Sequence, residues 1–102
     1  MADPVNQITV TAQNQATDWI RAGQDKRMSI FITGDLSGTI TLQAKKPEHT
    51  EADNPTFITD VEEHTTNVLR NTDQVVGTFD FRLICKTGDY TSGTAFIEIN
   101  VK

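Results

Sequence analysis

An alternation of apolar and polar residues with a period of two constrains this chain more than any other feature. Successive side chains of a β-strand point to opposite faces, so the alternation is typical of antiparallel sheets with one buried face. No window of eleven or more residues has helical periodicity, and the sixteen threonines suit a pleated surface. The alternating apolar positions are Ile8, Val10 and Ala12; Met28, Ile30 and Ile32; Ile40, Leu42 and Ala44; Phe79, Phe81, Leu83 and Cys85; and Ala95, Ile97, Ile99 and Val101.

Three further segments are weaker strand candidates, namely Thr17–Ile20, Thr56–Val61 and Thr66–Leu69. Together with the five alternating segments they predict seven or eight short strands at the spacing of a sandwich. The expected fold is therefore an all-β, two-sheet antiparallel sandwich, either jelly-roll or immunoglobulin-like. The 102 residues fit one domain over 1–102.

Two glycine-bounded connections have similar sequences. Gly34–Gly38 and Gly88–Gly93 each separate two alternating segments, and both are flanked by threonines. Glycine supplies positive φ angles, and Asp and Ser hydrogen-bond their own backbone, so we predict two β-hairpins. The similarity reflects either the common needs of tight turns or a sandwich with two related halves.

The segment Lys45–Pro55 contains two prolines and no apolar residue larger than alanine. We expect an exposed, flexible loop here, and loops of this length are often functional.

Charge and cysteine content exclude several classes of protein. Nine Lys and Arg against fourteen Asp and Glu give a net charge of −5, which disfavours partners such as nucleic acid and anionic membrane. No apolar run approaches the roughly 20 residues of a membrane span. A single cysteine, Cys85, cannot form an intramolecular disulfide, so we expect folding in a reducing compartment.

The sequence offers little for catalysis or cofactor binding. His49 and His64 have acidic neighbours but no metal-ligand spacing, so we expect solvated charged turns. No nucleophile elbow or phosphate-binding glycine loop occurs, and Cys85 lies on an apolar strand face where a thiol is inert. We therefore predict no catalytic, cofactor or metal residues, and no enzyme. Trp19 is expected as a core or interface anchor rather than a ligand platform, and Tyr90 either packs under its own turn or contacts a partner.

The C-terminal third resembles a family of small proteins of tailed bacteriophages and prophages. Phe81–Ala95 is similar to their aromatic-Arg-Leu strand followed by a Gly-Asp-Tyr-Thr-Ser-Gly-Thr turn, and Ser37–Gln43 is similar to an earlier strand. The resemblance extends from Met28 to Ile99 with a gap. Where relatives often have an Asp-Gly-Gly-x-x-Trp hairpin, this chain has Lys45–Pro55 and then Phe57.

The resemblance implies a non-catalytic virion protein, made in the host cytoplasm and located on the outer capsid surface. The role we expect is capsid decoration, or cement, with the major capsid protein as partner and a dimer or trimer as the assembly. The alternative is a receptor- or carbohydrate-binding module of the tail or head fibre, or a head–tail connector component. The candidate contact residues are Trp19, Asp35, Leu36, Pro47, His49, Pro55, Asp89, Tyr90 and Thr91.

Overall fold

The computed structural model describes residues 5–50, 54–71 and 77–101. Within these ranges the chain is all-β, as predicted. It has eleven strands rather than seven or eight, because one edge strand is broken in two and the sheet-to-sheet connections contain two short strands. The strands are β1 (Gln7–Val10), β2 (Gln15–Ala16), β3 (Ile20–Ala22), β4 (Met28–Gly34), β5 (Ser37–Gly38), β6 (Ile40–Lys45), β7 (Thr59–His64), β8 (Val68–Asn71), β9 (Phe79–Cys85), β10 (Tyr90–Ser92) and β11 (Ala95–Val101).

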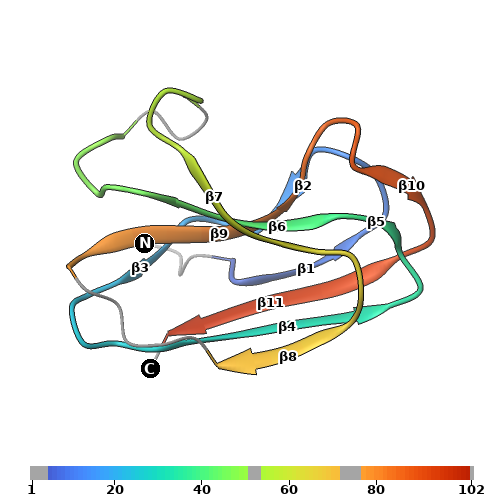
Figure 1. Cartoon of the computed structure of the whole chain (residues 1–102), viewed down its shortest axis with the longest axis horizontal. Coiled ribbons are helices and arrows are strands. Elements are labelled where there is room, and N and C mark those ends of the chain that lie inside the picture. The colour runs from blue at the N-terminus through green and yellow to red at the C-terminus, as the bar shows by residue number, and fades with distance from the viewer. Residues whose placement is uncertain (1–4, 51–53, 72–76, 102) are drawn as a thin grey trace.

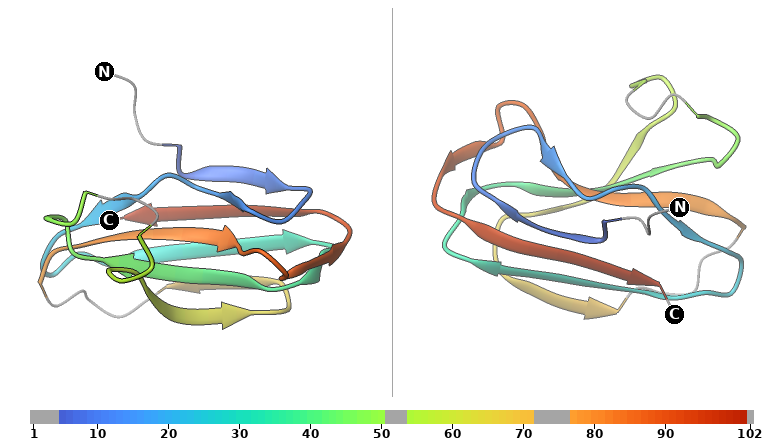
Figure 2. Two further views of the ribbon diagram at one scale, coloured as in Figure 1. Left: turned by 90° about the horizontal axis from the view of Figure 1, so that it is seen from above. Right: turned by 180° about the vertical axis from the view of Figure 1, so that it is seen from behind.

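Two antiparallel sheets form the sandwich (Figures 1 and 2). The first has the order β1-β11-β4-β8. In the second, β9 lies between β6 and the pair β2 and β3, and β7 forms the far edge. If β2 and β3 count as one broken strand and the short β5 and β10 are left out, eight main strands remain. Renumbered 1 to 8 in chain order, they are arranged as 1-8-3-6 in the first sheet and 2-7-4-5 in the second. This is the strand order of a jelly roll. This connectivity decides between the two sandwich types that the sequence left open.

The core lies between the sheets and consists mainly of the alternating residues predicted from the sequence, with Ala22 of β3 in addition. Their burial removes apolar surface from water, which is the dominant favourable contribution to folding. Ala12 is exposed, since β1 ends at Val10, and Ala44 and Val101 are only partly buried. The fully buried members include Val10, Ile30, Leu42, Leu83, Cys85, Ile97 and Ile99.

The three weaker strand predictions are displaced along the chain. Thr17 lies in the break between β2 and β3, where its amide donates to Leu83 O at 3.0 Å and its hydroxyl accepts from Leu83 N at 3.1 Å. The strands expected at Thr56–Val61 and Thr66–Leu69 begin instead at Thr59 and Val68. These segments have weak alternation, so pairing with β6 and β4 rather than local pattern sets their limits.

The two predicted hairpins are wrong. β4 and β6 belong to different sheets, as do β9 and β11, so Gly34–Gly38 and Gly88–Gly93 are crossovers between the sheets. Glycine-rich turn chemistry is compatible with both kinds of connection, and only the strand partners distinguish them. The crossovers lie side by side at one end of the sandwich, on the right of Figure 1, which we call the crossover end.

Candidate functional site

The crossover end brings Ser37–Gln43 next to Phe81–Ala95, two segments that are far apart in the sequence. β5 and β10 form a two-stranded antiparallel ladder in which Tyr90 is opposite Gly38 and Ser92 is opposite Ser37. Outside this ladder, the amide of Asp35 donates to the carbonyl of Thr94 at 2.9 Å. The two crossovers therefore form one hydrogen-bonded unit rather than two independent loops.

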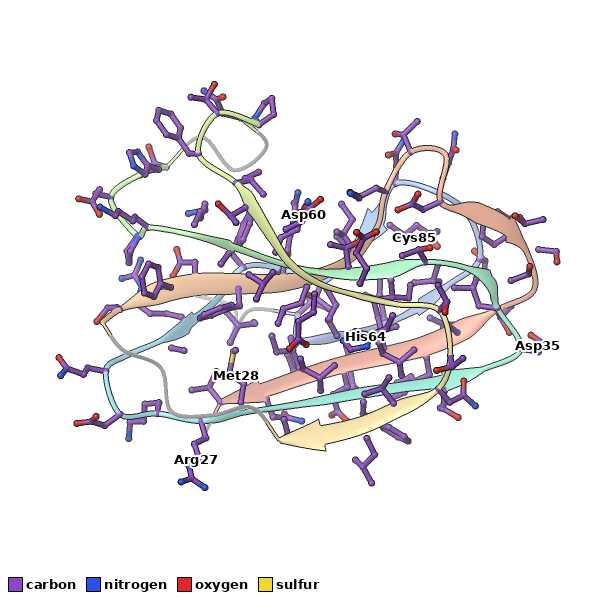
Figure 3. The ribbon with its side chains drawn as sticks, viewed as in Figure 1. Arg27, Met28, Asp35, Asp60, His64 and Cys85 are labelled. Atoms are coloured by element: carbon purple, nitrogen blue, oxygen red, sulfur yellow. The ribbon has the colours of Figure 1, made fainter. Side chains whose placement is uncertain are left out.

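Asp35 and Asp89 hold equivalent places in this unit. Oδ1 of Asp35 accepts from the amide of Thr94 at 2.9 Å, and the carbonyl of Asp89 accepts from the amide of Thr39, also at 2.9 Å. Each aspartate thus accepts a hydrogen bond from the backbone amide of the threonine that follows the other crossover. Figure 3 labels Asp35 at the outer tip of this end.

Two glycines allow the crossovers to approach closely. A Cβ atom on Gly38 would overlap the carbonyl oxygen of Asp89, and one on Gly93 would overlap the carbonyl oxygen of Asp35. Gly93 also has φ +84°, which strains any side-chain-bearing residue. The repeated glycines of the two similar sequences therefore face each other's aspartates.

The other predicted contact residues at this end differ in their exposure. Leu36 and Tyr90 pack against the core, and the Tyr90 hydroxyl donates to Gly93 O at 3.0 Å. Tyr90 therefore packs under its own turn, one of the two possibilities left open. Thr91 and Asp35 are exposed. The exposed surface of the crossover end thus includes short polar side chains on a hydrogen-bonded backbone.

Trp19 lies on the outer face of the second sheet and not in the core. Its half-buried ring is 5.1 Å from Lys45 Nζ and 4.5 Å from Arg82 Cζ, measured to the ring centroid. Cations are attracted to the negative face of an indole ring, so these contacts fix the ring against the sheet. The Trp19 ring therefore contacts two cations of its own chain.

A buried ion pair lies beside Trp19. Lys45 Nζ is 3.1 Å from Asp80 Oδ2, and both side chains are less than 10% exposed. Arg21 Nε lies 3.0 Å from Asp80 Oδ1. Burial acts to raise the pKa of Asp80, but the hydrogen bonds from Arg21 and Lys45 outweigh it and lower the pKa below its ordinary value. Lys45 is therefore a buried strand residue and not part of an exposed loop as predicted.

An open groove of about 680 Å³ crosses the same face. Its polar side chains bond one another: Arg82 Nε to Gln43 Oε1 at 2.9 Å, Gln43 Nε2 to Asp60 Oδ1 at 2.9 Å, and Lys86 Nζ to Asp60 Oδ2 at 2.7 Å. The hydrogen bonds from Lys86 and Gln43 lower the pKa of Asp60. The lining of the groove therefore contains a connected hydrogen-bond network of two cations, one carboxylate and one amide.

The remaining predicted contact residues lie around this face. Pro55 lines the groove, and Pro47 is half-buried. The His49 ring stacks on Phe57 with centroids 3.9 Å apart. His64, expected in a solvated turn, is half-buried in β7 with Nε2 3.1 Å from Glu62 Oε1, and it lies well away from Asp60 in Figure 3. The structure therefore separates the candidate residues into a group at the crossover end and a group on the second sheet.

Sequence reasoning missed a third surface, on the outer face of the first sheet. Phe31 and Phe96 are half-buried there with ring centroids 6.1 Å apart, and Leu69, the cross-strand partner of Phe31, is 83% exposed. We call these three residues the apolar patch. Phe31 and Phe96 occupy positions where the alternation of two segments predicts an outward, polar residue. Two aromatic residues at such positions were the sequence feature that could have predicted this surface.

The described residues include no cluster of three or more His, Cys, Asp or Glu side chains able to hold a metal ion. Cys85 is fully buried, and burial, followed by the charge of Asp89, raises the pKa of its thiol. The described part of the chain has no helix long and apolar enough to span a membrane.

Comparison with protein-family models and with curated proteins gives no match to this sequence.

Proposed function

We propose that the protein is a structural component of a bacteriophage virion, a capsid decoration or cement protein. It binds the major capsid protein on the outer surface of the head, after folding in the host cytoplasm. The proposal rests on the resemblance of Ser37–Gln43 and Phe81–Ala95 to small phage proteins. The alternating strands and crossovers provide the rigid surface that such a role requires.

The packing of the two resembling segments against each other is the observation that carries the proposal. They are far apart in sequence, yet β5 pairs with β10 and each crossover bonds the backbone of the other. A preorganised surface loses little conformational entropy on binding. We therefore assign capsid contact to the crossover end, with Asp35, Ser37 and Thr91 among its exposed residues.

Binding to undecorated capsids tests this function. Purified protein mixed with such capsids should pellet with them in hundreds of copies per particle and raise the capsid melting temperature. A protein that stays in the supernatant and leaves capsid melting unchanged would exclude the cement role. A handful of copies per virion would favour a connector or tail component instead.

A glycan- or receptor-binding module is the second candidate, favoured by the open groove on the second sheet. Its polar lining has the planar amide, carboxylate and guanidinium groups that suit hydroxylated ligands. The groove network is already internally bonded, and the Trp19 ring is covered by two cations. A glycan array separates the two functions, since a cement protein gives no hits and a glycan-binding module gives a defined set.

A further inference from the structure

The four edges of the sandwich differ in how well they are protected against pairing with another strand. Unpaired amides and carbonyls on an edge strand attract further strands, and proteins protect such edges with charges, bulges or covering segments. β7 is protected in this way. It contains a bulge opposite Leu42 and Gln43, and it carries the carboxylates Asp60, Glu62 and Glu63.

The edges formed by β1 and by β2 with β3 lie together on one side of the sandwich. The amide of Val5 donates to Asp18 Oδ2, and the amide of Asp18 donates to Val5 O, both at 2.8 Å. The side chain of Gln15 accepts from the amides of Thr11 and Ala12 just beyond β1. A broken strand and these local bonds leave little continuous edge for a partner.

β8 is the exception among the described strands. It pairs with β4 on one side, and its other side is an edge of the first sheet (Figure 1). Leu69, in the middle of this strand, is 83% exposed, and its cross-strand neighbour is Phe31 of the apolar patch. An open edge beside exposed apolar side chains is the usual signature of strand addition.

We propose that β8 pairs with β8 of a second copy of this chain, so that the first sheets of two molecules form one continuous sheet. A second copy is the occupant because it brings the same edge and the same weakly charged face to the junction. Two chains with a net charge of −5 repel each other overall, but the paired rows of this face that contain Leu69, Phe31 and Phe96 carry one carboxylate, Glu98, so the repulsion is small at this edge.

The register follows from the geometry of antiparallel pairing. A two-fold axis perpendicular to the sheet keeps outward residues on the same face, so Leu69 must oppose an outward residue of the partner. Placing Leu69 opposite Leu69 of the partner subunit pairs residues 68–70 with residues 70–68 of the partner, all within β8. It also produces an apolar row across the interface, in which each Leu69 is flanked by its own Phe31.

The interface is small, because a four-residue edge buries less than the roughly 800 Å² per partner of a stable complex. We therefore expect a concentration-dependent dimer with a dissociation constant on the order of 10 μM to 1 mM. If the proposed capsid function holds, antiparallel pairing places the two crossover ends at opposite ends of the dimer. Each dimer could then bridge two capsid sites, where tethering raises the effective concentration.

Sedimentation equilibrium over this concentration range tests the dimer. The weight-average mass should rise from 11.3 kDa towards twice that value, and Leu69→Lys should abolish the rise while leaving the circular dichroism spectrum unchanged. Val61→Lys is the matched control, because Val61 is a 48% exposed apolar residue on β7, the edge strand that its bulge and carboxylates protect. A wild-type mass of 11.3 kDa at every concentration, or equal loss in both variants, would overturn the proposal.

Cysteine cross-linking tests the register by a second route. Directly opposed residues of an antiparallel pair lie within disulfide range, so Leu69→Cys should give a covalent dimer under mild oxidation and Val61→Cys should not. The opposite pattern would place the interface elsewhere. The Leu69→Lys monomer should still bind capsids, but with reduced avidity. This measurement separates the two proposals, because capsid binding can persist without the dimer and the dimer can form without capsid binding.

Discussion

Gly38 faces the carbonyl oxygen of Asp89 so closely that a Cβ atom at position 38 would overlap this oxygen, and no side chain fits between the two crossovers. Gly38→Ala should therefore lower the free energy of unfolding by about 3 kcal/mol, because the backbone must shift and the β5–β10 ladder must open. Urea denaturation measures this cost.

Two other glycines provide matched controls for that change. A Cβ atom on Gly88 meets nothing within 4 Å, but its φ is +87°, so Gly88→Ala should cost about 1–2 kcal/mol from backbone strain alone. Gly23 has open space and no positive φ, so Gly23→Ala should change stability by less than about 0.5 kcal/mol. Equal effects at all three positions would show that the close approach of the crossovers contributes nothing.

Capsid affinity should depend on the exposed surface of the crossover end. Thr91→Lys adds a long cationic side chain at that surface and should lower the affinity for undecorated capsids at least about tenfold, a cost of roughly 1.4 kcal/mol. Gln24→Lys makes the same charge change at an exposed position in the connection between β3 and β4, and it should leave capsid affinity unchanged. Co-sedimentation with capsids compares the affinities of the two variants. If only Gln24→Lys lowered the affinity, the capsid contact would lie at the opposite end of the sandwich.

The ion pair of Lys45 and Asp80 should make the protein sensitive to acid. The pKa of Asp80 is lower in the folded chain than its ordinary value of about 3.8. Its contribution to stability is therefore present above that value and is lost as pH falls through the folded pKa. Urea midpoints between pH 2 and 7 should show a steeper fall in acid for the wild type than for Asp80→Asn.

Asp60 offers a comparison for that pH profile. Its pKa is also lowered, but its side chain is 41% exposed, so Asp60→Asn should flatten the acid dependence less than Asp80→Asn does. Lys45→Met leaves the buried carboxylate with Arg21 alone and should cost about 2–3 kcal/mol near neutral pH. An Asp80→Asn profile that parallels the wild type would contradict this assignment.

The Cys85 thiol should react only when the protein unfolds. It is fully buried, and its raised pKa keeps it protonated at pH 8, where thiolate is the reactive species. Labelling by a disulfide reagent should therefore proceed at a rate that increases with urea in parallel with unfolding. The Leu69→Cys variant supplies the control, since its added thiol is exposed and should react at once. Immediate labelling of wild-type Cys85 would contradict its burial.

Local pattern determined most of the strands but not their partners. Met28, Ile30 and Ile32 alternate with residues that are less buried, and β4 forms where this alternation predicts a strand. The prediction succeeds because a strand with one buried face needs an apolar residue at every second position. Phe31 falls in the polar phase of the same strand. The sequence could not show that it belongs to an apolar patch with Phe96 and Leu69, since those residues come from strands far along the chain.

The sequence by itself therefore determined the all-β class, the two-sheet sandwich and most of the core, because side-chain alternation is a property of each strand alone. Only the tertiary structure decided that Gly34–Gly38 and Gly88–Gly93 are crossovers, since that depends on which sheet receives the next strand. The same long-range pairing buried Lys45 against Asp80, placed Lys45 and Arg82 against the Trp19 ring and put β8 at an edge of the first sheet. Contacts between distant segments carry these features, and no local window of residues contains them.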